Sequence, residues 1–116
     1  MTAAEFRRTA LRMPDAVEGA HMGHADFRVG GKIFATLGYP DARHGAVMLT
    51  PAEQREFMSA HPRAFVPAAG KWGEGGSTVV SLRDADPEIV ADAIRAAWRR
   101  RAPKARERSR RQTGRG

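Results

Sequence analysis

The chain contains no cysteine, which excludes disulfide bonds, thiolate catalysis and cysteine-based zinc sites. No stretch approaches the roughly 20 apolar residues that span a bilayer, so we expect no membrane partner. The first residues, MTAAEFRR, have no apolar run of the kind that follows the charges of a secretory signal. With 116 residues, the chain is long enough to bury one core without covalent staples. These absences predict a single-domain cytoplasmic protein.

Positive charge is present in excess but is unevenly distributed. The formal net charge is +7. From Arg99 onward there are nine basic residues against Glu107 alone, whereas the preceding 98 residues hold 11 basic and 12 acidic side chains. The body is therefore close to neutral, and the high pI comes from the C-terminal end. We expect a folded domain over residues 1–103 and a disordered basic tail over 104–116, because the latter has almost no apolar side chains.

Three segments begin with the residues that favour helix starts. Thr2 and Glu5 form a capping-box pattern, Thr50-Pro-Ala-Glu53 repeats it with proline at the first helical position, and Asp86-Pro-Glu88 is a third start. The helices are expected to end at Pro14, Pro62 and Pro103. Between Asp86 and Pro103 the apolar residues recur at helical spacing, which predicts one buried stripe. Its members are Ile89, Val90, Ala93, Ile94, Ala97 and Trp98.

Strand patterns occupy most of the remaining chain. Residues Ala25–Val29 alternate, Gly30-Gly31 is a two-residue hairpin signal, and Lys32–Leu37 is nearly all apolar. A third strand is expected at Ala46–Leu49, and residues 15–23 are interpreted as a polar connection. Two more strands, 64–66 and 78–82, flank a glycine-rich loop that carries Lys71 and Trp72. The order α-β(3)-α-β(2)-α predicts a two-layer α+β domain, an antiparallel sheet with helices on one face.

Several motifs together resemble the MmcQ/YjbR family of small bacterial proteins. They are Pro14 with Glu18, His21-x-Gly-His24-x-x-Phe27-Arg-Val, Gly31-Lys-Ile-Phe-Ala-Thr-Leu37, Phe65-Val-Pro-Ala, Lys71-Trp-Gly73 and Ala97-Trp98. The resemblance runs from about residue 3 to about residue 104. It implies a CyaY-like or type III secretion chaperone-like fold of the same element order. Members of the MmcQ/YjbR family are commonly labelled DNA-binding through fold analogy and have no established enzymatic activity. Met22 and Ser77 stand where the family often has aromatic residues, which weakens a base-stacking role.

The leading functional hypothesis is weak, sequence-independent binding of DNA or RNA. Arginines of the tail would neutralise phosphates, and basic residues of the hairpin and the glycine-rich loop, with one indole, would orient the body. This hypothesis requires the body residues to share one surface. The predicted nucleic-acid-binding residues are Arg28, Lys32, Lys71, Trp72, Arg100, Arg101, Arg106, Arg108, Arg110 and Arg111.

Two alternatives stay open. One is a small-molecule or anion pocket beneath the Lys71–Trp72 loop, bordered by His21 and His24; the other is a protein-interaction adaptor. The loop matches neither a Walker nor a dinucleotide template, since Phe65 stands where the first Walker glycine is needed. No serine lies in an elbow motif, so we predict no catalytic residues and no enzyme. No metal site and no cofactor are expected, because loop packing explains the histidines better than metal ligation.

Overall fold

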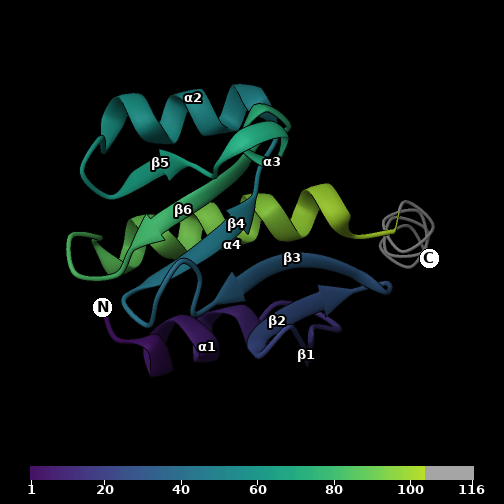
Figure 1. The fold of residues 1–116 in the computed structure, drawn as a ribbon. Helices are drawn as coiled ribbons and strands as arrows, with labels where there is room; N and C mark the ends of the chain where they lie inside the picture. Colours follow the sequence, from purple (N-terminus) through teal and green to yellow (C-terminus); the bar gives the residue numbers. More distant parts are fainter. Residues whose placement is uncertain (104–116) are drawn as a thin grey trace.

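The computed structural model describes residues 1–103, which form one antiparallel sheet with helices around it (Figure 1). The strands follow the spatial order β1-β2-β3-β4-β6-β5, and each neighbouring pair is antiparallel. The elements are α1 (Ala3–Leu11), β1 (Val17–His21), β2 (His24–Val29), β3 (Lys32–Leu37), β4 (His44–Met48), α2 (Pro51–Ala60), β5 (Phe65–Pro67), α3 (Gly70–Glu74), β6 (Ser77–Ser81) and α4 (Pro87–Arg101).

The predicted α+β class and its local signals are confirmed. Both Thr caps form complete capping boxes at α1 and α2, and the Asp86 side chain accepts a hydrogen bond from the Glu88 amide at the start of α4. The β2–β3 hairpin turns at Gly30 and Gly31, which have φ values of 58° and 79°. Positive φ at both central positions fits the right-handed twist of the flanking strands, which is why glycine is needed there.

Two elements were absent from the sequence prediction. The connection expected at residues 15–23 contains β1, an edge strand paired with β2 over five residues from Val17↔Arg28 to His21↔His24. Its side chains are mostly exposed, so it lacks the apolar alternation that reveals a half-buried strand. The glycine-rich loop instead contains the short helix α3. A side chain at Gly73 would meet the Ala68 carbonyl oxygen at 1.9 Å, so close packing rather than a flexible loop requires that glycine.

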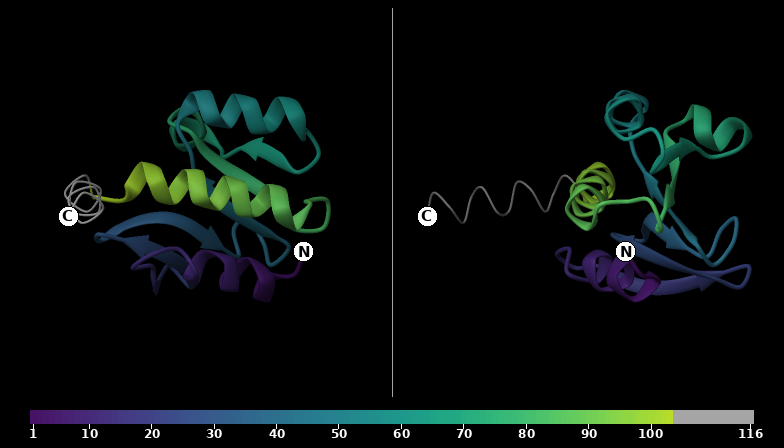
Figure 2. Two further views of the ribbon diagram at one scale, coloured as in Figure 1. Left: turned by 180° about the vertical axis from the view of Figure 1, so that it is seen from behind. Right: turned by 90° about the vertical axis from the view of Figure 1, so that its left-hand side faces the viewer.

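The hydrophobic core lies between one face of the sheet and the helices α1 and α4. Phe27 in β2 and Val47 in β4 are fully buried there with Phe6 of α1 and Ile94 of α4. In the left view of Figure 2, α4 crosses in front of the sheet with α1 beside it. The Trp98 indole N–H donates to the Pro14 carbonyl oxygen at 2.9 Å, which joins α4 to the connection that follows α1. The predicted packing of helices on one face therefore holds for α1 and α4.

The remaining helices, α2 and α3, lie at the β5 end of the sheet (Figures 1 and 2). The ring of Phe57 in α2 packs against Phe65 of β5, with centroids 5.2 Å apart. The buried Gln54 amide of α2 donates to the carbonyl oxygens of Gly73 and Ser77 at 3.0 and 3.1 Å. One side chain thus fastens α2 to α3 and to the start of β6.

Candidate functional site

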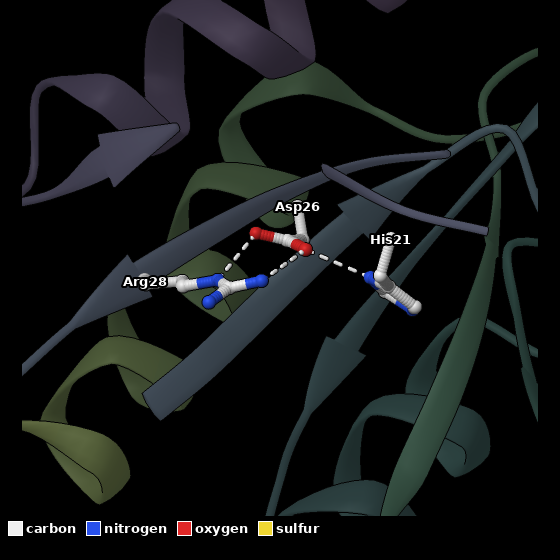
Figure 3. Close-up of polar contacts among 3 residues, drawn as sticks. All are labelled: His21, Asp26 and Arg28. Carbon is white, nitrogen blue, oxygen red and sulfur yellow. Dashed lines mark hydrogen bonds and ion pairs between the residues drawn. The ribbon is translucent and has the colours of Figure 1, made fainter. Parts of the chain in front are cut away.

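An ion cluster lies on the sheet face opposite α1 and α4. Phe27 and Val29 of β2 enter the core, so the alternate residues Asp26 and Arg28 point to the other face. The Asp26 carboxylate accepts hydrogen bonds from Arg28 Nε at 2.7 Å and from Arg28 Nη2 at 3.0 Å. Its Oδ2 atom also lies 2.7 Å from His21 Nδ1 (Figure 3). One carboxylate is therefore shared by two basic side chains from adjacent strands.

Burial differs sharply among the three side chains. Asp26 is completely buried, whereas 36% of the Arg28 side chain and 44% of the His21 side chain remain exposed. Figure 3 shows the carboxylate flanked by the guanidinium on one side and the imidazole on the other. A carboxylate can only accept hydrogen bonds, so His21 must donate from Nδ1 and its Nε2 atom is left for another partner.

Gly19 makes this arrangement possible. It is the β1 residue directly across from Asp26 in the register. A Cβ atom at this position would lie 2.9 Å from Asp26 Oδ1 and 3.3 Å from Arg28 Nε. The guanidinium consequently lies over a residue without a side chain, and any larger residue would displace it.

The ion pair shifts the pKa values of both Asp26 and Arg28 toward their charged forms. Hydrogen bonds from Arg28 lower the pKa of Asp26 below its usual range, burial opposes the shift, and the His21 bond adds to it. The same bonds from Asp26 raise the pKa of Arg28. Asp26 is therefore held as a carboxylate and Arg28 as a guanidinium.

His24, predicted to border a pocket, lies beside this cluster as the cross-strand neighbour of His21. Its ring packs edge-on against Tyr39, with centroids 5.9 Å apart and an interplanar angle of 82°. Gly38, at φ 93°, gives the chain room to turn beside the imidazole, since a Cβ there would lie 3.3 Å from His24 Nδ1. His21 and His24 thus lie on neighbouring strands, β1 and β2, and not beside the Lys71–Trp72 segment.

The other predicted body residues are divided between two ends of the sheet. Lys32 is exposed and pairs with Val29 beside the β2–β3 turn. Lys71 and Trp72 are on α3, and the Trp72 side chain is 77% exposed. Since α3 packs against β5 and β6, the strands β3 and β4 separate it from β2 (Figure 1). The fold does not gather Arg28 and Lys32 with Lys71 and Trp72.

The predicted arginines at the end of α4 have mixed surroundings. Arg100 Nη1 donates to the Leu49 carbonyl oxygen and lies 3.4 Å from that of Gly75. Arg101 is half-buried; desolvation, with a contribution from neighbouring Arg100, lowers its pKa. The remaining predicted residues, Arg106, Arg108, Arg110 and Arg111, lie outside the described residues, as does the predicted disordered tail 104–116.

Two shallow hollows occur elsewhere in the folded part. One, of about 330 Å³, is lined by His61, Arg63, Asp84 and Asp86 among others; the second, of about 360 Å³, lies between α1 and the start of α4. Neither of these two is lined by Lys71, Trp72 or the histidines of the pocket hypothesis. Within residues 1–103, no cluster of three or more His, Asp or Glu side chains is placed to hold a metal ion. No helix in that range combines the length and apolar content needed to cross a bilayer.

Sequence reasoning considered Asp26 only as a metal ligand with His21 and His24, an arrangement it did not favour, and it did not single out Gly19. A usable signal was present for Asp26, because opposite charges two residues apart in a strand lie on one face and can pair. No comparable signal identified Gly19, since its importance follows from its register opposite Asp26.

The architecture and this ion cluster describe an α+β protein built on a helix-covered antiparallel sheet whose second face carries polar side chains. Comparison with known protein families identifies the family: residues 11–100 match the YjbR family, and the chain belongs to it. A similar solved structure is the Deinococcus radiodurans protein DR2400, with a DUF419 domain. It shares 17% identity at a TM-score of 0.69, over 84% of this chain and 75% of that one, which is a likeness of fold. No curated protein matches the chain.

Proposed function

We propose that this YjbR family protein is a non-enzymatic, sequence-independent nucleic-acid-binding protein that binds mainly through its C-terminal basic segment. The observation that carries this proposal is the charge distribution: nine basic residues against one acidic residue from Arg99 onward, on a body that is nearly neutral. Arginines at this density release condensed counterions when they neutralise phosphates, which gives affinity without reading bases.

Ion pairing in the body favours the C-terminal segment as the main source of affinity. Arg7 is paired with Glu18 and Arg95 with Asp92. A cation that already has a carboxylate partner offers less net charge to a phosphate than an unpaired one.

Lys71 and Trp72 on α3 supply the second contact in this proposal. The exposed indole can stack on an unpaired base, and the adjacent ammonium can approach a phosphate. Trp98 is 6% exposed, so a change of tryptophan fluorescence on binding would report mainly on Trp72. Quenching by single-stranded DNA that disappears in a Trp72→Phe variant is the expected result.

The tail contribution is tested by neutralising four arginines in the full chain. Arg106, Arg108, Arg110 and Arg111 are replaced together by glutamine, and DNA affinity is measured at rising salt. Each lost phosphate contact should reduce the log-log salt slope by about 0.9 on duplex DNA. The matched control replaces four exposed arginines of the body, Arg8, Arg55, Arg63 and Arg83. Equal loss of affinity in the two variants would show that only net charge matters and would refute a tail-directed mode of binding.

A further inference from the structure

The ion cluster on the uncovered sheet face has more hydrogen-bond donors than its single carboxylate uses. Arg28 has five N–H donors. Asp26 receives the Nε hydrogen and one Nη2 hydrogen, which leaves both Nη1 hydrogens and the second Nη2 hydrogen. Arg28 and His21 keep more than a third of their side-chain surface exposed. The cluster therefore presents unused donors to solvent from a rigidly held guanidinium.

Asp26 acts as the orienting group of the cluster. Its Oδ2 atom bonds both Arg28 Nη2 and His21 Nδ1, so these two nitrogens are close neighbours held on a common atom. A buried carboxylate with three such bonds fixes the rotamers of both basic side chains before any ligand arrives. Preorganisation of this kind reduces the entropy cost of binding.

The surroundings of the cluster add apolar surface. Val17, the cross-strand neighbour of Arg28, is 59% exposed, and Tyr39, which packs on His24, is 51% exposed. Gly19, between Val17 and His21 on the same strand, leaves the guanidinium uncovered from the β1 side. Charged donors are thus bordered by an aliphatic residue on one side and an aromatic residue on the other.

From these observations we propose that Arg28 and His21, oriented by Asp26 over Gly19, form a binding site for a small organic carboxylate with a compact apolar body. The ligand carboxylate accepts the free Nη hydrogens of Arg28, as expected for a guanidinium that recognises planar oxyanions. His21 Nε2 contacts the ligand's polar edge, and the apolar body lies toward Val17 or Tyr39. This site does not include Lys71 or Trp72, and it is independent of nucleic-acid binding by the tail.

The site is tested by NMR titration of the ¹⁵N-labelled full chain at constant ionic strength, with sodium chloride exchanged for benzoate, acetate or phosphate. We expect saturable shifts at the Arg28 Nε–Hε signal and at the amides of β1, with benzoate saturating at a lower concentration than acetate. Tighter binding of phosphate than of both carboxylates would make the carboxylate assignment wrong. Shifts that are linear in concentration, or confined to residues 99–116, would overturn the site altogether.

Two variants test whether Arg28 and His21 are the side chains that bind benzoate. Arg28→Lys keeps a cation beside Asp26 but removes the planar guanidinium with its paired N–H donors. It should weaken benzoate binding about tenfold, the equivalent of one charge-assisted hydrogen bond. His21→Asn leaves both Arg28–Asp26 bonds in place and should weaken binding less, so it serves if Arg28→Lys does not fold. The control, Lys32→Gln, removes an exposed cation of the same hairpin and should leave affinity unchanged. Unchanged affinity in Arg28→Lys or, where that variant does not fold, in His21→Asn would refute the proposal, as would loss in Lys32→Gln alone.

Discussion

Replacement of Gly19 by alanine offers a direct test of how strongly the Asp26–Arg28 pair depends on an empty position beside it. Gly19 has no positive φ, so its backbone can accept alanine. Alanine reduces the conformational entropy of the unfolded chain and by itself should stabilise the protein by about 0.4–1 kcal/mol. Against this, the new Cβ would lie 2.9 Å from Asp26 Oδ1 and 3.3 Å from Arg28 Nε, so the Asp26 carboxylate and the Arg28 guanidinium must shift.

The cost of that shift can be bounded from the contacts. A hydrogen bond to a charged group contributes about 1.5–3 kcal/mol. Because more than a third of Arg28 is exposed, solvent screening reduces the loss of one fork bond to about 1–2 kcal/mol. The loss exceeds the entropy gain, and Gly19→Ala should lower the free energy of unfolding by about 0.5–1 kcal/mol.

The assay is urea denaturation followed by tryptophan fluorescence, which reports on the buried Trp98. In a background carrying Asp26→Ala and Arg28→Ala, the atoms that meet the new Cβ are gone, and Gly19→Ala should become stabilising. The matched control is Gly75→Ala, at φ −81°, where a Cβ would have its nearest contact at 3.5 Å, an ordinary van der Waals distance. If Gly19→Ala stabilises the wild-type chain as Gly75→Ala does, the close fit of the cluster has no energetic consequence and the reasoning fails.

Three further outcomes follow from described contacts. Asp26 has a lowered pKa, so its stabilising contribution is complete above about pH 4 and is lost as pH falls through its folded-state pKa. The stability of Asp26→Asn should therefore depend less on pH in the acid range than that of the wild-type chain. Acid unfolding followed by circular dichroism measures the difference. Gln54→Leu should lower the free energy of unfolding by about 1–3 kcal/mol, because it removes the buried side-chain donor to the Gly73 carbonyl oxygen. Arg100→Met should destabilise the fold by about 1–2 kcal/mol through the lost bond to Leu49, while changing DNA affinity by no more than neutralising one arginine of the tail does.

Local sequence signals identified the elements whose formation depends on neighbouring residues. The Thr2 and Thr50 capping boxes and the Gly30-Gly31 turn each lie within a few residues of the groups they contact, and the stripe of α4 is a repeat within one segment. Such patterns act through backbone geometry and short-range hydrogen bonds, so the linear order of residues is sufficient to recognise them. The antiparallel α+β class follows from the same signals.

The elements that escaped prediction depend on contacts across the fold. Strand β1 has exposed side chains and is a strand because it completes the edge of β2, whereas α3 forms where Gly73 packs on Ala68. The segment 70–74 contains two glycines, which disfavour a helix locally, and packing overrides that preference.

The sequence by itself determined the neutral body and basic C-terminal end, the helix caps, the β2–β3 turn and the alternation that places Asp26 and Arg28 on one face. Only the tertiary structure decided that His21 shares the Asp26 carboxylate, that Gly19 lies beneath the guanidinium, and that α3 is separated from β2 by the strands β3 and β4. The physical reason is that charge and short-range hydrogen bonding are properties of neighbouring residues, whereas strand register and sheet order are set by the packing of the whole chain.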